Sequence, residues 1–196
     1  MRKYALIGFV IGAVLAPLFL SSCKGLSPEE LKGSLEIVEM SSKWVAKTYQ
    51  PWPPKLVLVP TVSFRVKNIS GKPLNYLNFN AIFKFRDDLE NLGDNFLAAI
   101  RKEPIPPGEM SQVITLKSNF GVEGTSLAKF QDNPNWKTVI CKLFVQSKGS
   151  IHVLLGEYEV SKEIDFKEPE PVGQEQKEAE KRTSVGPAIP GREGWV

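Results

Sequence analysis

Apolar and polar residues alternate over the central part of this 196-residue chain, and this alternation limits the fold more than any other feature. In the segment 55–67 five apolar side chains stand at even positions, and in 77–85 five stand at odd positions, with Ile82 as the exception. A period of two places successive side chains on opposite faces of a strand, so each segment predicts a β-strand with one face in a core. The two apolar sets are Leu56, Leu58, Val62, Phe64 and Val66, and Leu77, Phe79, Ala81, Phe83 and Phe85.

A turn rich in Asn, Gly and Pro, residues 68–73, separates these two segments. We therefore expect the two strands to pair as a hairpin with both apolar faces on one side. Thr61 and Arg65, on the other parity of the first strand, are expected to face water. Pro60 lies on the apolar parity but cannot donate a ladder hydrogen bond, which predicts a sheet edge or a bulge.

Further strands are predicted along the rest of the central region. They cover 35–49 (one or two strands), 95–101, 109–116, 136–146 and 150–161, with one or two helical turns within 125–131. Seven or eight strands without a long helical period predict an all-β fold, an antiparallel β-sandwich over residues 34–165. Cys141 shares one face of its strand with Val139 and Leu143, so we expect this thiol in the core.

The N-terminus carries Arg2 and Lys3, an uncharged run over residues 4–20, and small residues before Cys23. This order is typical of an export signal that is later removed. The alternative is an uncut transmembrane anchor, because the run is near the lower limit of about 17–25 residues for crossing a bilayer. Pro17 within the run, and the lack of a basic cluster after it, favour the cleaved signal.

The tetrapeptide Leu20-Ser21-Ser22-Cys23 resembles the lipobox of bacterial lipoproteins. The resemblance implies a signal helix over residues 1–22, cleavage between Ser22 and Cys23, and a covalent lipid such as palmitate on the Cys23 sulfur. It also implies a lipid-anchored place in the cell envelope, with the domain facing the periplasm or the exterior. Lys24 stands where an aspartate would favour the inner membrane, which slightly favours the outer membrane.

The stretch from Phe64 to Phe85, followed by Pro104-Ile-Pro-Pro-Gly-Glu-Met110, resembles the FxLYD-type family of small bacterial domains. The shared pattern is a strand ending in valine-x-asparagine, a lysine-proline-leucine turn, an aromatic-rich strand and a proline-glycine-glutamate turn. The chain departs from the pattern in its aromatic strand and in an insertion at 86–101. The resemblance implies an immunoglobulin-like β-sandwich in an envelope-associated or secreted protein, and it carries over no catalytic residues.

Residues 23–33 are predicted to form a lipidated cysteine with a tether, and residues 166–196 a disordered tail. The tail is rich in Pro, Glu, Gln and Lys and cannot bury enough apolar surface to order itself. The 25 basic and 22 acidic side chains are nearly balanced, and no basic stripe indicates a nucleic-acid partner. The bilayer, reached through Cys23, is therefore the first expected partner.

Few residues could carry chemistry. His152, the one histidine, has no nucleophile motif beside it, so we expect no catalytic residue, and no cofactor besides the lipid on Cys23. The acidic loop 86–94 leaves open a calcium-type enzyme or binder, although its spacing is not that of an EF-hand and a solvated loop without metal is the expectation. Its candidate ligands are Asp87, Asp88, Glu90 and Asp94. A carrier of a small apolar ligand between the sheets is a further alternative.

The segment Tyr49-Gln-Pro-Trp-Pro-Pro-Lys55 combines aromatic side chains with a stiff backbone. Aromatic anchors of this kind occur at interfaces, so Tyr49 and Trp52 are the candidates for partner binding. The alternative is that Trp52 covers one end of the sandwich. The sequence thus predicts a membrane-anchored, non-catalytic binding or structural module that meets an envelope protein or peptide.

Overall fold

The computed structural model describes residues 26–130 and 132–169, which form a sandwich of two sheets. One sheet has the order β5–β2–β1–β9, with β6 also paired to β2, and the other has the order β4–β3–β7–β8. The strands are β1 (Leu35–Gln50), β2 (Lys55–Asn68), β3 (Leu77–Phe85), β4 (Asn91–Ile100), β5 (Ile114–Lys117), β6 (Val122–Gly124), β7 (Val139–Gln146), β8 (Val153–Glu159) and β9 (Ile164–Asp165), and the helices are α2 (Pro28–Ser34) and α3 (Leu127–Phe130).

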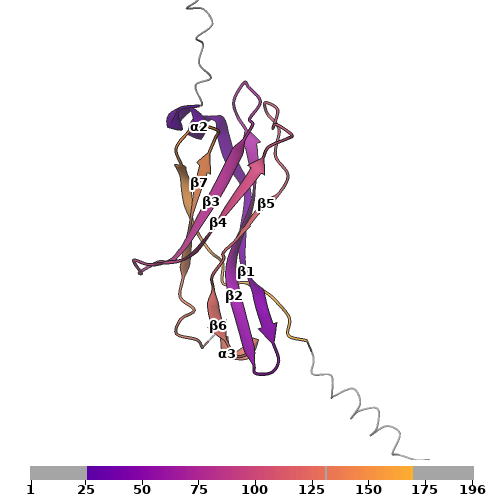
Figure 1. The fold of residues 1–196 in the computed structure, drawn as a ribbon, viewed down its shortest axis with the longest axis vertical. Helices are drawn as coiled ribbons and strands as arrows, with labels where there is room; N and C mark the ends of the chain where they lie inside the picture. Colours follow the sequence, from indigo (N-terminus) through magenta and orange to yellow (C-terminus); the bar gives the residue numbers. More distant parts are fainter. Residues whose placement is uncertain (1–25, 131, 170–196) are drawn as a thin grey trace, which may run out of the picture.

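The predicted all-β sandwich is confirmed, with nine named strands instead of seven or eight. All pairings are antiparallel except that of the short strand β9, which runs parallel to β1. The domain is elongated, with α2 at one end and the β1–β2 turn near α3 at the other (Figure 1). The predicted signal helix lies outside the described residues.

The predicted hairpin of β2 with β3 is wrong, because the two strands lie in different sheets. The chain passes from one sheet to the other after β2, and the side chain of Asn68 stabilises this connection. Its Nδ2 donates to the carbonyl oxygens of Lys72 and Ile105, at 2.8 Å each. The two apolar faces meet across the core, where the rings of Phe64 and Phe79 pack edge to face with centroids 5.3 Å apart. Alternation therefore indicates which face of each strand is apolar, but not which sheet the strand joins.

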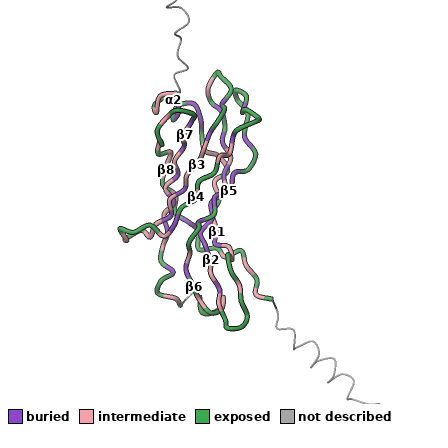
Figure 2. The backbone as a smooth tube through the Cα atoms, viewed as in Figure 1, coloured by how far each residue is buried: buried purple, intermediate pink, exposed green. Residues whose placement is uncertain are grey.

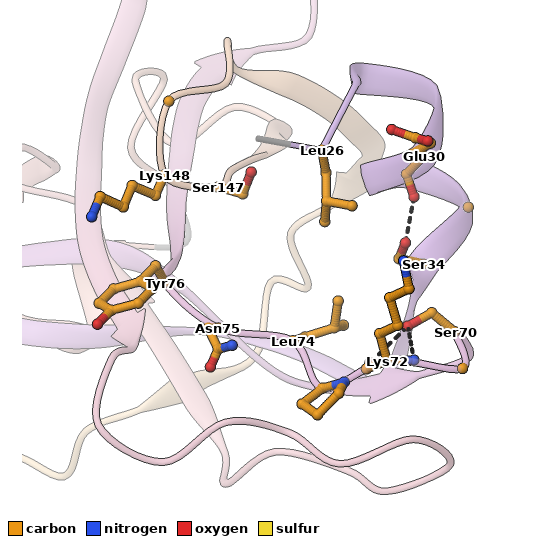
Figure 3. A pocket seen from close by; sticks show the side chains of 14 residues that line it. Leu26, Glu30, Ser34, Ser70, Lys72, Leu74, Asn75, Tyr76, Ser147 and Lys148 are labelled. Carbon is orange, nitrogen blue, oxygen red and sulfur yellow. Dashed lines mark hydrogen bonds between the residues drawn. The ribbon is translucent and has the colours of Figure 1, made fainter. Parts of the chain in front are cut away.

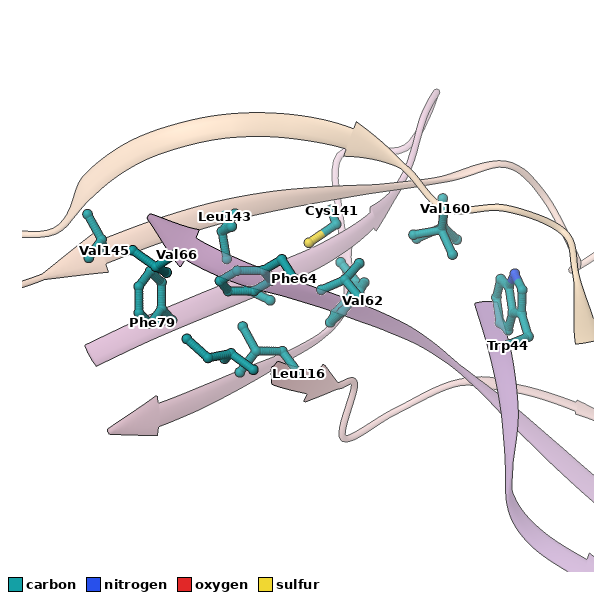
Figure 4. Close-up of a cluster of buried hydrophobic side chains, with 14 of the residues drawn as sticks. Trp44, Val62, Phe64, Val66, Phe79, Leu116, Cys141, Leu143, Val145 and Val160 are labelled. Carbon is teal, nitrogen blue, oxygen red and sulfur yellow. The ribbon is translucent and has the colours of Figure 1, made fainter. Parts of the chain in front are cut away.

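The core lies between the facing sheets, and buried segments run along both of them (Figures 2 and 4). The predicted apolar set of β2 is fully buried, and so is that of β3 except for the half-buried Phe85. Cys141 in β7 is also fully buried, as predicted. Burial raises the pKa of the Cys141 thiol to about 12, so this thiol stays protonated and unreactive near neutral pH.

Pro60 lies in an inner strand, not at a sheet edge. Trp44, its partner on β1, donates its N–H to the carbonyl of Glu163 at 2.7 Å, so the Pro60 backbone faces the other neighbour of β2. There β5 has ended and β6 has not begun, and the Ser118 N–H donates to the Pro60 carbonyl at 3.0 Å. Pro60 has no backbone N–H to donate, and it lies where neither β5 nor β6 pairs with β2, so no ladder hydrogen bond is lost. Thr61, expected to face water, is buried beside this break.

Gly121 lies where the chain between β5 and β6 passes against β2. A Cβ here would lie 2.0 Å from the carbonyl oxygen of Leu58 and 2.7 Å from Cγ1 of Val59. Because the backbone of an inner strand cannot easily move aside, we expect Gly121→Ala to lower the free energy of unfolding by about 3 kcal/mol. Urea unfolding of the full chain, followed by tryptophan fluorescence, measures this loss.

Gly71→Ala is the matched control, because a Cβ at Gly71 meets no atom within 4 Å. We expect it to change the free energy of unfolding by less than about 1 kcal/mol, in either direction. Equal effects of the two substitutions would contradict the close approach at Gly121.

The domain begins earlier than predicted. Ser27 and Glu30 form a capping box at α2: Ser27 Oγ accepts from the Glu30 N–H at 3.2 Å, and the Glu30 carboxylate accepts from the Ser27 N–H at 2.9 Å. Leu31 within α2 is fully buried. The predicted tether 23–33 is therefore folded from residue 26 onward.

The first residues of the predicted tail, 166–169, are among the described residues. Phe166 packs against Tyr49, with ring centroids 5.4 Å apart. The Glu168 carboxylate accepts a hydrogen bond from the Leu127 N–H at 2.8 Å, at the start of α3. Residues 166–169 therefore contact the domain, whereas the predicted disorder of 170–196 falls outside the described residues.

Candidate functional site

The predicted lipidation site Cys23, and the cleavage site between Ser22 and Cys23, lie outside the described residues. The structure does place the point where the chain enters the domain, at Leu26 beside α2 (Figure 1). Three residue steps separate Cys23 from Leu26, and each spans at most about 3.8 Å, so the two Cα atoms are within about 11 Å. Any group attached to Cys23 is therefore held close to the α2 end.

Trp52 stands at the opposite end of the domain, at the tip of the β1–β2 hairpin (Figures 1 and 2). Its side chain is 85% exposed, so the alternative that it covers an end of the core is wrong. Prolines occupy the other three positions of the turn 51–54, and Gln50 Nε2 donates to the Trp52 carbonyl at 2.8 Å. The tip therefore presents a large aromatic side chain on a backbone with little freedom.

Tyr49, the other predicted binding residue, has a different environment. It is half-buried, and its ring packs against Phe166, the residue that follows β9. The contact ties the chain after β9 to the base of the hairpin tip. Trp52 is therefore the exposed residue of the two, whereas Tyr49 packs against the domain at the base of the hairpin turn.

The four acidic candidates do not share one loop, because β4 begins at Asn91. Asp87, Asp88 and Glu90 lie in the β3–β4 turn, whereas Asp94 lies within β4. Asp94 exchanges two hydrogen bonds with Asn119, at 2.9 and 3.0 Å, which connect the edge of β4 to the chain after β5. Within residues 26–130 and 132–169, no three His, Cys, Asp or Glu side chains lie close enough to hold a metal ion.

A cavity of about 1010 Å³ opens at the α2 end, between α2, the turn after β2 and the β7–β8 turn (Figure 3). We call it the α2-end cavity. The side chains that matter most for its chemistry are Leu26, Glu30, Lys72, Leu74, Tyr76, Ser147 and Lys148. The site could not be expected from the residue order, because its three segments are far apart along the chain and none of them carries a binding motif.

Two features of the cavity wall are unusual. Tyr76 has a φ of 51°, in the left-handed region that a bulky residue rarely adopts, and its side chain is about half exposed. Strained residues of this kind gather at functional sites. Ser147 is only 6% exposed, and its Oγ has no hydrogen-bond partner among the residues described. The Ser147 hydroxyl is thus enclosed by the protein and is not presented to the open part of the cavity.

The charged groups of the cavity are two lysines and one glutamate. Lys148 Nζ lies 5.5 Å from the centroid of the Tyr76 ring, and in the described part of the chain neither Lys72 nor Lys148 forms an ion pair. Hydrogen bonds from the backbone and side chain of Ser27 lower the pKa of Glu30, with a smaller contribution from Lys72. The glutamate is thus ionised but already bonded to Ser27, whereas both ammonium groups are available.

The outer face of the β4–β3–β7–β8 sheet carries a second group of partly exposed apolar side chains. Phe96, Phe144 and Leu154 follow one another in register across the sheet, with Asn80 between the two phenylalanines. His152, which precedes β8 instead of lying within it, is exposed, and its ring meets that of Phe96 edge to face at 6.5 Å. This places His152 at the surface, away from any nucleophile within the core.

The chain matches no protein-family model and no curated protein. Among solved structures, it is similar to a structural-genomics target at 11% identity, over 72% of this chain and 98% of that one, with a TM-score of 0.41. A glycoside hydrolase family 2 β-glucuronidase gives 10% identity over 61% of this chain and 10% of that one (TM-score 0.36). The ApaA protein from Bordetella pertussis gives 12% over 65% and 93% (TM-score 0.35). Likenesses at this level indicate neither family nor activity.

None of the helices within the described ranges is long and apolar enough to cross a bilayer.

Proposed function

We propose that this protein is a bacterial envelope lipoprotein, held on a membrane by acyl chains on Cys23, and that it acts as a non-catalytic binding module. The observation that carries the proposal is the exposed Trp52 at the end of the domain opposite to Leu26. Strand β1, with 16 residues at about 3.3 Å each, spans about 50 Å between these two ends. An anchor at Cys23 would thus leave Trp52 facing away from the bilayer.

The hairpin tip has the properties of a preformed binding element. Tryptophan is enriched among the few interface residues that supply most of the binding free energy. A side chain already exposed on a proline-rich turn loses little conformational entropy when a partner binds. The partner would be a protein or peptide of the cell envelope, with the outer membrane slightly favoured for the anchor because of Lys24.

The FxLYD-type resemblance gains support from the way its motifs meet. Asn68 at the end of β2, the Lys72-Pro-Leu74 turn and the segment 104–110 lie together: Leu74 and Ile105 exchange two backbone hydrogen bonds, and the Gly108 N–H donates to the Asn68 carbonyl at 2.8 Å. Gly108 has a φ of 80°, which explains the glycine of its turn. The motifs form one structural unit, as expected if they define an immunoglobulin-like domain family.

The Trp52 assignment is tested by placing a benzophenone amino acid at position 52 or at position 89 in the full chain, in intact cells. Leu89 is the matched control, because it is 98% exposed and lies in the β3–β4 turn. We expect a discrete cross-linked protein from position 52 and none from position 89. We then expect Trp52→Ala to weaken binding of that purified partner by about 30-fold, and Leu89→Ala to leave it unchanged. Equal cross-linking from both positions, or an unchanged affinity of Trp52→Ala, would contradict the proposal.

A further inference from the structure

The α2-end cavity lies next to the proposed anchor. Leu26 lines it, and Cys23 is within about 11 Å of Leu26 along the chain. An acylated Cys23 would sit at the bilayer surface, so the cavity would open within reach of the lipid headgroups. The folded start of the domain at residue 26 is decisive here, because the longer tether predicted from the sequence would have lifted the cavity away from the membrane.

The chemistry of the cavity suits an anionic group. Lys72 lies along the α2 side, and Lys148 runs past Tyr76 on the other side of the opening (Figure 3). Both ammonium groups lack ion pairs among the residues the structure describes, while the one carboxylate, Glu30, is bonded to Ser27. Lysine ammonium groups are common ligands of phosphate oxygens.

The rest of the wall suits the part of a lipid next to its phosphate. Leu26 is only partly buried and points into the space between α2 and the β7–β8 turn, whereas Leu74 is 3% exposed and belongs to the core beneath it (Figure 3). The Leu26 side chain can contact the glycerol and the first methylene groups. Tyr76 stands at the mouth, and an aromatic ring with a polar tip is typical of the membrane interface.

We propose that the α2-end cavity binds the phosphate headgroup of an anionic phospholipid in the bilayer that carries the acylated Cys23. The inference rests on the proposed lipid anchor. Its consequence is that the domain stands upright on its α2 end, with Trp52 pointing away from the surface. Basic side chains near an anionic bilayer each strengthen the attraction about fivefold.

The test uses the full-length protein purified from cells and reconstituted into vesicles through its own acyl chains. An environment-sensitive fluorophore is attached at Asn75→Cys, in the cavity wall, or at Gln50→Cys, near the hairpin tip. Cys141 is buried with a raised thiol pKa, so labelling is confined to the introduced cysteine. We expect the emission at position 75 to shift as phosphatidylglycerol is added to phosphatidylcholine vesicles, and that at position 50 to stay constant.

Lysine variants identify the source of the attraction. Lys148→Gln should raise the phosphatidylglycerol fraction needed for half of the shift about fivefold, and adding Lys72→Gln should abolish the shift. Lys137→Gln is the matched control, because Lys137 lies over the Phe85 ring at 5.9 Å much as Lys148 lies over Tyr76. A similar effect of the control would overturn the cavity assignment.

Two further outcomes would overturn the proposal. One is a fluorophore emission at position 75 that does not change when phosphatidylglycerol is added. The other is an equal shift with soluble glycerol phosphate in pure phosphatidylcholine vesicles, which would assign the cavity to a free phosphate compound. Failure of the anchor itself is seen separately, because protein without acyl chains would not float with vesicles of either composition.

Discussion

Cys23→Ser is expected to abolish incorporation of labelled palmitate completely. In the proposed lipoprotein, the Cys23 sulfur of the lipobox-like order Leu20-Ser21-Ser22-Cys23 would accept the lipid, and serine offers no thiol. Each methylene group buried in a bilayer contributes about 0.8 kcal/mol, and stable anchoring takes more than one chain. The proposed membrane attachment would therefore depend on this one sulfur atom. Metabolic labelling, with intact-mass measurement of the purified protein, checks both the label and the cleavage.

Cys141→Ala is the control for this experiment, because Cys141 is buried in the core and its thiol has a raised pKa. We expect this variant to keep the label, and the wild-type mass to equal residues 23–196 plus acyl chains. A wild-type protein that takes up no palmitate, or that begins at Met1, would contradict the lipoprotein proposal. The second result would instead favour the uncut anchor.

Phe64→Ala is expected to lower the free energy of unfolding by about 3–5 kcal/mol. Phe64 is fully buried in β2 and packs edge to face on Phe79 of β3, so its ring joins the two sheets. Truncation removes the transfer free energy of the ring and leaves a cavity between two sheets whose backbones are fixed by their ladders. Urea unfolding followed by tryptophan fluorescence gives the difference directly.

The matched control is Phe96→Ala, on the outer face of the other sheet. Phe96 is 53% exposed, so its truncation leaves no enclosed cavity and should cost less than about 1 kcal/mol. If both variants lost the same stability, the ring of Phe64 would not be the link between the sheets that its burial indicates. An unchanged stability of Phe64→Ala would contradict the packing of the core itself.

Much of the local structure could be predicted from the sequence. The alternation in 55–67 and 77–85 indicated the buried faces of β2 and β3, and Cys141 fell on the buried face of β7 as expected. These features depend on neighbours a few residues apart, so the order of side chains along the chain is enough to set them.

Contacts between distant segments could not be obtained in this way. The residue types in 68–73 do not predict whether the next strand joins the same sheet or the other one, because a hairpin turn and a turn between sheets use the same residue types. The exposure of Trp52 depends on how far the β1–β2 hairpin extends past its neighbours. The α2-end cavity depends on a helix and two turns that meet only after the sheets have packed.

Residue order was thus enough to predict a β-sandwich, the apolar faces of its strands and the expected place of a lipid. The packed fold was needed to find that the domain starts within three residues of Cys23, that Trp52 is at the far end, and that Lys72 and Lys148 line one cavity. The difference lies in the range of the interactions. Side-chain alternation is a local property of the backbone, whereas sheet partners and cavities result from burying apolar surface over the whole domain.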